Sequence, residues 1–128
     1  MGTICIEKEA PIISLYVGIR VGEKIVRPKM ALDNGATYTM VSWDLAEVLN
    51  LRPEISHRRI QIITASGIEA APVLTVNSMK ALGEKAKNVN IIIHDLPSKS
   101  YVDGLLGLSF LKNFNVNINF RKGVLSIE

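Results

Sequence analysis

The chain has 128 residues, of which 48% are apolar and 21% charged, and its formal net charge at pH 7 is +3. This length and composition predict one globular domain, residues 1–128, with a core but no room for a second domain. The fifteen Lys and Arg residues are scattered along the chain, and Arg58-Arg59 has no interleaved aromatic residues. We therefore expect no nucleic-acid partner, since single-stranded nucleic acid favours clustered cations beside aromatic rings.

Cysteine and histidine usage argues against disulfide and metal chemistry. Cys5 is the only cysteine, so an intrachain disulfide is excluded and an oxidising compartment gains no support. His57 and His94 have no companions at metal-ligand spacing, so we expect ordinary surface or strand-end histidines, no metal and no cofactor. The sequence has neither a membrane-length apolar run nor a signal-peptide pattern, and we expect a cytoplasmic protein without a membrane segment.

The first predicted elements are two strands that lead to an aspartate. Residues 12–21 alternate in part and are rich in β-branched residues, and Gly22-Glu23-Lys24 turns the chain into a second apolar run, residues 25–32. Pro28 inside this run predicts an edge or an irregularity, because proline cannot donate to a strand ladder. Asp33 follows at once.

The segment Asp33-Asn34-Gly35 has two interpretations. Asn-Gly between apolar runs is a strong signal for a hairpin turn in which both central residues need φ > 0. The same residues also suit a functional loop, because glycine lets the backbone approach a ligand closely. The wider context of the chain favours the functional loop.

A helix and a long hairpin come next. Residues 41–51 change to a helical period, with Ser42 as N-cap and Asp44 in the first turn. Residues 55–64 return to period two and residues 68–81 predict a long returning strand. The four residues between them, Thr64-Ala65-Ser66-Gly67, predict a hairpin tip that is either a mobile cover over a site or an ordinary surface turn.

The last third predicts more strands and one further helical turn. A turn at Gly83-Glu84-Lys85 leads to a strand over 89–93 that is buried on both faces, and a loop follows over 95–99. A helical turn is predicted over 108–111, and then a half-buried strand whose core face includes Phe120. The chain finishes with a turn at Arg121-Lys122-Gly123 and a final strand over 124–127. Two β-hairpin units of this kind predict an all-β fold, a small closed β-barrel with one or two short helices.

Three motifs resemble the retropepsin-like, retroviral-type aspartic proteases, in their order and at their usual spacing. They are Leu32-Asp33-Asn34-Gly35-Ala36 before a helix, Thr64-Ala65-Ser66-Gly67 at a hairpin tip, and Asp103-Gly104-Leu105-Leu106-Gly107 near the end. The resemblance covers nearly the whole chain. It implies a single-domain half-molecule that hydrolyses peptide or protein substrates as a symmetric homodimer.

The resemblance also implies roles for individual residues. Asp33 is the catalytic aspartate, and Leu105-Leu106-Gly107 packs beneath its loop. The residues that contact substrate are Gly35, Ala36 and the flap tip, Thr64, Ala65, Ser66 and Gly67. One departure concerns Asn34, which stands where the family has Thr or Ser as a brace between the two loops of the dimer. Asparagine is longer and brings an extra acceptor, so activity is in doubt.

Three hypotheses follow. The first is an active dimeric aspartic endopeptidase. The second is a catalytically weak or inactive relative that binds extended peptides in the dimer cleft by strand pairing. The third is an unrelated β-barrel binding module in which Asp33-Asn34-Gly35 is only a turn.

Overall fold

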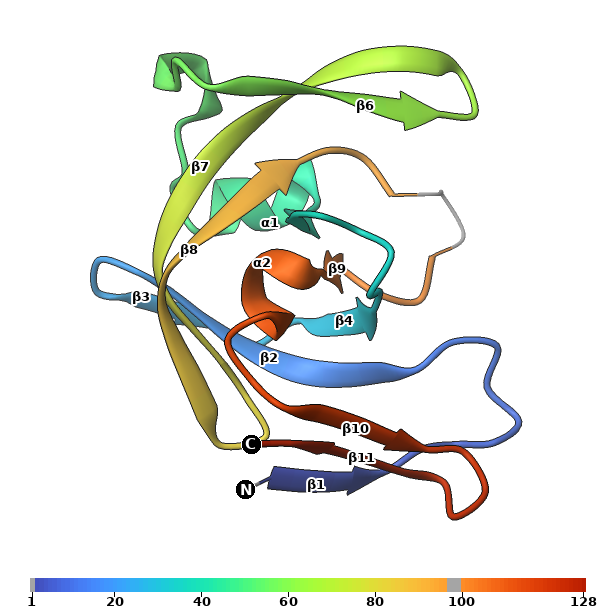
Figure 1. The fold of residues 1–128 in the computed structure, drawn as a ribbon. Helices are drawn as coiled ribbons and strands as arrows, with labels where there is room; N and C mark the ends of the chain where they lie inside the picture. Colours follow the sequence, from blue (N-terminus) through green and yellow to red (C-terminus); the bar gives the residue numbers. More distant parts are fainter. Residues whose placement is uncertain (1, 97–99) are drawn as a thin grey trace.

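The computed structural model describes residues 2–96 and 100–128, and Figure 1 shows their arrangement. The strands are β1 (Gly2–Cys5), β2 (Ser14–Val21), β3 (Lys24–Val26), β4 (Lys29–Leu32), β5 (Thr39–Val41), β6 (Arg59–Thr64), β7 (Gly67–Ala81), β8 (Glu84–Ile93), β9 (Gly104–Leu106), β10 (Val116–Asn119) and β11 (Val124–Ile127). The helical segments are α1 (Trp43–Val48), the 3-10 turn η1 (Pro53–Ile55) and α2 (Leu108–Leu111).

A closed ring of strands forms the body of the molecule. Neighbours in the ring are β2, β4, β9, β5, β8 and β7, and an additional pairing of β2 with β7 closes it. β3 extends the ring beside β2, and β6 extends it beside β7. Ring closure pairs backbone N–H and C=O groups that would otherwise be exposed at strand edges and open to association with another chain. The expected small closed β-barrel with short helices is confirmed.

The barrel core is built from the inward-facing residues of these strands. Val17 and Ile19 on β2 and Ile91 and Ile93 on β8 are fully buried, as the alternation along each strand requires. Phe110 on α2 is also fully buried, and its ring lies 4.9 Å from that of Phe114. The short helix α2 is therefore part of the hydrophobic core.

A second sheet lies below the barrel in Figure 1, with β11 between β1 and β10. Leu125 and Ile127 of β11 are fully buried and belong to the main core cluster. The prediction that Phe120 faces the core is wrong, because its side chain is 70% exposed. The reason is that β10 ends at Asn119, and Phe120 begins the turn that leads to β11.

The β6–β7 hairpin projects from the barrel at the top of Figure 1. Ile60 and Ile62 pack against a small cluster formed by Ala71, Val73 and Ile92, while Ile63 points to solvent. The predicted period of two is thus confirmed. The predicted start of the strand at residue 55 is wrong, because a 3-10 turn begins at Pro53 and the strand begins at Arg59.

The predicted N-cap of helix α1 is confirmed. Ser42 is the N-cap of α1, and its hydroxyl accepts a hydrogen bond from the Leu45 N–H at 3.1 Å. The helix is shorter than predicted because Val41 belongs to β5 and Asn50 adopts a positive φ.

The turn predicted at residues 83–85 lies at Leu82 and Gly83, both with positive φ, so β8 already begins at Glu84. Residues 97–99 of the predicted loop lie outside the described residues.

Candidate active site

The Asp33 turn lies at the end of β4, next to β9, a strand from the last third of the chain. β9 runs between β4 and β5, parallel to β4 with Leu32 opposite Leu106, and antiparallel to β5 with Met40 opposite Leu105. The Asp33 N–H continues this ladder by donating to the Leu106 carbonyl at 3.0 Å. Since β9 separates β4 from β5, the intervening loop does not close a hairpin.

The conformation of the turn agrees with this topology. Neither Asn34 nor Gly35 has a positive φ, which a two-residue Asn-Gly hairpin turn would require. Instead, the Ala36 N–H donates to the Asp33 carbonyl at 3.2 Å and closes a four-residue turn. The hairpin interpretation of Asn34-Gly35 is therefore wrong, and the segment forms a loop at the end of an interior strand.

The Asp33 carboxylate is held by the backbone of its own turn. Its Oδ1 accepts a hydrogen bond from the Gly35 N–H at 3.0 Å, and the side chain is half-buried. A Cβ built on Gly35 would lie 3.2 Å from Oδ1, closer than most real Cβ contacts. Glycine thus allows the close approach between backbone and carboxylate that the sequence suggested. Among the described residues, no second carboxyl group hydrogen-bonds to Asp33.

The underside of the turn is tightly packed. Thr39 is fully buried, and its Oγ1 accepts a hydrogen bond from the Gly107 N–H at 3.1 Å. The Thr39 N–H donates to the hydroxyl of Ser109 at 2.8 Å. A Cβ on Gly107 would lie 2.7 Å from the Ala36 carbonyl oxygen, so only glycine fits here. The segment predicted to support the loop, Leu105-Leu106-Gly107, does lie against it.

The tip of the β6–β7 hairpin extends over the same side of the molecule as the Asp33 turn (Figure 1). Thr64 pairs with Gly67, which leaves Ala65 and Ser66 at the tip. The Thr64 Oγ1 accepts a hydrogen bond from the Ser66 N–H at 3.1 Å and donates one to the Gly67 carbonyl at 3.1 Å. Gly67 has a φ of +114°, which only glycine adopts readily. The predicted tip is therefore a well-defined turn.

One polar contact near this hairpin was not expected from the sequence. Glu69 on β7 and His94, the residue directly after β8, hydrogen-bond to each other, with 3.0 Å between Oε2 and Nε2. Hydrogen bonds from His94, and secondarily from Thr64, hold the pKa of the Glu69 carboxyl below its ordinary value. The His94 side chain is 22% exposed and directly follows β8, so of the two expected alternatives it is the strand-end histidine. No local pattern could have revealed this pair, because Glu69 lies on β7 and His94 follows β8.

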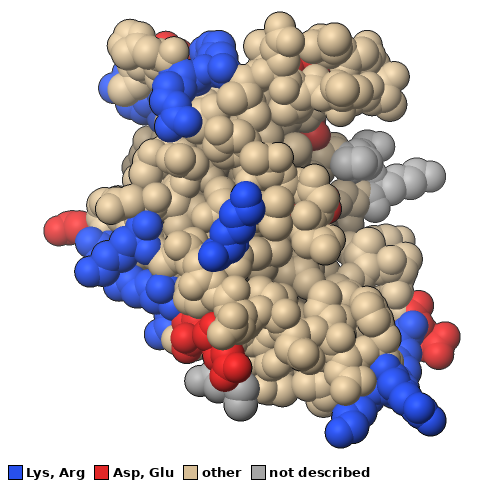
Figure 2. Space-filling view, viewed as in Figure 1, with Lys and Arg blue, Asp and Glu red and all other residues tan. Residues whose placement is uncertain are grey.

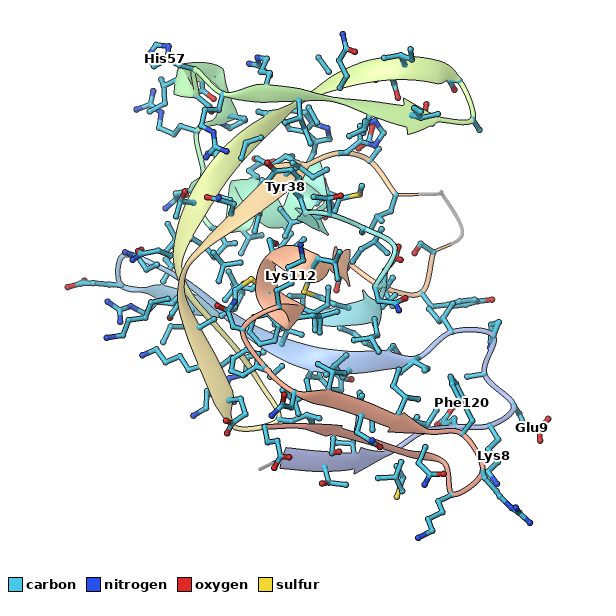
Figure 3. The ribbon with its side chains drawn as sticks, in the orientation of Figure 1. Lys8, Glu9, Tyr38, His57, Lys112 and Phe120 are labelled. Atoms are coloured by element: carbon cyan, nitrogen blue, oxygen red, sulfur yellow. The ribbon has the colours of Figure 1, made fainter. Side chains whose placement is uncertain are left out.

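Within the described part of the chain, Asn34 and His57 make no hydrogen bond to the groups that hold the Asp33 turn. Asn34 is exposed, and among the described residues nothing hydrogen-bonds to its side chain. His57 lies at the opposite end of the β6–β7 hairpin from its tip, as Figure 3 shows. Within residues 2–96 and 100–128, no group of three or more His, Cys, Asp or Glu side chains could hold a metal ion. No helix in this part of the chain is long and apolar enough to cross a membrane.

Comparisons with known proteins point to one family. A family model described as gag-polyprotein putative aspartyl protease matches residues 18–113. Among solved structures, the chain is similar to the crystal structure of a retropepsin-like aspartic protease from Rickettsia conorii, with a TM-score of 0.74 and 22% identity over 98% of this chain and 87% of that one. None of the curated proteins searched matches this chain. The structural likeness establishes a shared fold and confirms the resemblance expected from the motifs.

Proposed function

This chain belongs to the family of gag-polyprotein putative aspartyl proteases, and on this premise we propose that it is an aspartic endopeptidase that works as a homodimer. Each protomer contributes one Asp33, and the pair activates a water molecule for attack on a peptide bond. The observation that carries this proposal is the Asp33 turn itself. It presents a carboxylate that its own backbone positions, and no second carboxyl group among the described residues of the same protomer hydrogen-bonds to it.

The chemistry explains why two copies are needed. Hydrolysis without a covalent intermediate requires a base that removes a proton from water and an acid that protonates the scissile carbonyl. Two carboxyl groups a few ångströms apart do not both ionise, so in aspartic proteases generally the pair shares one proton and supplies both roles. A single Asp33 provides half of this arrangement. A symmetry-related copy would provide the other half.

Apolar side chains near the Asp33 turn support a dimer surface on this side. Leu32, directly before Asp33, lines a hollow of about 580 Å³ together with Ile12 and Phe120. Ile12 and Phe120 are exposed, and Figure 3 shows Phe120 beside the chain that leads into β2. A partner that brings a second Asp33 to this side would cover these side chains and remove apolar area from water.

Substrate would lie between the Asp33 turns and the β6–β7 hairpins. We assign the substrate contacts to Gly35 and Ala36 in the turn and to the tip, Thr64-Ala65-Ser66-Gly67. The tip combines exposed backbone with small side chains, so it can pair with an extended peptide as an additional strand. We further propose that the tip acts as a flap, which moves to admit the peptide and then covers it.

Replacement of the catalytic carboxylate tests the reaction. Asp33→Asn removes the base and acid while nearly preserving shape, so peptidase activity should fall by at least about 10²- to 10⁴-fold. Asp44→Asn, at an exposed position in the first turn of α1, is the matched control and should retain activity. Activity that survives Asp33→Asn, or a protein that stays monomeric with bound substrate analogue, would refute the proposal.

A second candidate function is peptide binding without turnover, and Asn34 is the observation that favours it. Asn34 occupies the position of the hydroxyl residue that braces the two loops in related enzymes. Isothermal titration with a peptide-like inhibitor, combined with an assay of cleavage, separates the two functions. Binding that depends on Asp33 without any cleavage would select peptide binding without turnover.

A further inference from the structure

The outer face of the barrel carries a cationic groove on a different side from the Asp33 turn. We define the cationic groove by Arg20, Arg27, Lys80 and Lys85, with Tyr16 and Gly18 in its lining; its volume is about 440 Å³. None of its lining residues is acidic. Figure 2 shows Lys and Arg side chains gathered at the left of the view, over β3 and the adjoining strands.

The register of the sheet places these residues on one face. Gly18 on β2 lies opposite Lys80 on β7, and Lys80 lies opposite Lys85 on β8. In the next row, Arg20 lies opposite both Ile25 on β3 and Ser78 on β7. Directly opposed residues point to the same side of a sheet, so cations from separate strands converge here although they are far apart in the sequence.

Folding alone does not account for this arrangement. Lys80 and Lys85 are like charges directly opposite each other, which destabilises a sheet. Among the described residues, no carboxylate forms an ion pair with any of the four cations of the groove. The nearest acidic residues along these strands, Glu23 and Glu84, do not line it. Arg20 donates from Nε to the Gly22 carbonyl at 2.9 Å, but a backbone carbonyl does not neutralise its charge, so the groove keeps its positive charge for an anionic partner.

Two further features select the kind of polyanion. Tyr16 is 69% exposed, so the groove presents an aromatic ring beside its cations. Gly18 leaves the floor open, since even a Cβ there would have no neighbour closer than 3.8 Å. A positively charged groove with an exposed aromatic ring suits single-stranded nucleic acid, whose phosphates contact the cations while a base stacks on the ring.

We propose that the cationic groove binds single-stranded nucleic acid. The sequence led us to expect no such partner, because cations that are dispersed along the chain come together only through strand pairing. A flat membrane surface fits a concave groove less well. An acidic peptide would gain no strand pairing from β2, whose backbone is already paired on both sides, and the polyglutamate arm of the test covers pairing with β3, the last strand of the sheet. The proposal goes beyond peptide hydrolysis and uses none of the residues assigned to it, so the two can fail independently.

The test measures binding of a fluorescent single-stranded oligonucleotide to the intact protein as salt is varied. Four phosphate contacts give a slope of log K against log salt of about −2.8, and Lys80→Gln/Lys85→Gln should reduce it to about −1.4. The same double variant should weaken binding on the order of 50-fold at 50 mM salt. Tyr16→Ala should weaken binding about 5- to 160-fold without changing the slope.

Arg58→Gln/Arg59→Gln is the matched control, because it removes the same net charge from exposed positions on and before β6. It should leave slope and affinity nearly unchanged. Equal losses in the two double variants would show that net charge alone drives binding, and would overturn the proposal. Polyglutamate binding as tightly as the oligonucleotide, or binding to anionic vesicles in place of the oligonucleotide, would overturn it as well. Circular dichroism of each variant verifies folding.

Discussion

The carboxylate of Glu69 accepts a hydrogen bond from Nε2 of His94 at 3.0 Å, and this contact ties the β6–β7 hairpin to the barrel wall. The His94 backbone is itself anchored, because its N–H donates to the Val41 carbonyl at 3.1 Å. The second ring nitrogen, Nδ1, lies 2.9 Å from the Asp95 carbonyl oxygen. The ring of His94 therefore contacts the hairpin on one side and its own loop on the other.

Glu69→Gln tests whether this pair restrains the hairpin. The amide preserves size and an acceptor but removes the charge, so the hairpin should open more often and its amide hydrogens should exchange about two to five times faster. Hydrogen exchange of residues 60–70 measures the effect. Glu54→Gln breaks the exposed Arg52–Glu54 pair and is the matched control. The same acceleration in both variants would contradict a specific role for Glu69.

The pair also predicts a dependence on acidic pH. The pKa of Glu69 in the folded protein lies below its ordinary value of 4.5. Its contribution to stability is therefore fully present above pH 4.5 and is lost as the pH falls through the lower folded value. Exchange at the hairpin should accelerate in that acidic range in the wild-type protein and change less in Glu69→Gln. Parallel pH profiles for the two proteins would rule out this carboxyl as the source.

Asn34→Thr tests the unusual residue in the Asp33 turn. If the loops of two protomers brace each other through this position, a hydroxyl should restore the brace, tighten the dimer and raise peptidase activity. The expected gain is about 5- to 10-fold in dimer affinity, the value of one net hydrogen bond of about 1 kcal/mol. Sedimentation and initial rates measure it. Asn34→Ala, which offers no hydrogen bond, should show no such gain.

Thr39→Val tests the buried support under the turn. Valine keeps the volume of threonine but leaves the buried Gly107 N–H without its acceptor. We expect a loss of about 1–3 kcal/mol in the free energy of unfolding, measured by urea denaturation. Thr75→Val is the control, because Thr75 is exposed and its hydroxyl bonds to Asn90 at 2.8 Å. Equal losses at both positions would deny Thr39 a special role.

Gly107→Ala probes the close approach of backbone beneath the turn. The new Cβ would meet the Tyr38 carbonyl oxygen at 2.6 Å, so the loop must shift, and the free energy of unfolding should fall by about 1–3 kcal/mol. Gly18→Ala is the matched control, because its nearest atom would lie at 3.8 Å, an ordinary contact. Thermal denaturation of both variants measures the difference. A stable Gly107→Ala protein would mean that the loop adapts without cost.

Features that depend on a few neighbouring residues could be predicted from the sequence. Ser42 caps α1 because its hydroxyl meets the N–H three residues later, and Thr64 and Gly67 close the tip within four residues. The alternation along β6 likewise follows from local side-chain direction. Predictions failed where a strand ended, as at Phe120, because a strand stops where its partner stops, and the partner is not a local property.

The sequence by itself determined the β-rich fold class, the position of the Asp33 turn and the hairpin tip, since these depend on local backbone preferences and hydrophobic period. Only the tertiary structure decided which side chains and backbone groups contact the turn and the hairpin. The Thr39–Gly107 bond joins residues 68 positions apart, and the Glu69–His94 pair joins residues 25 apart. The cationic groove arises in the same way, because strand pairing brings together charges that the chain itself disperses. Such contacts follow from barrel closure, which no single segment encodes.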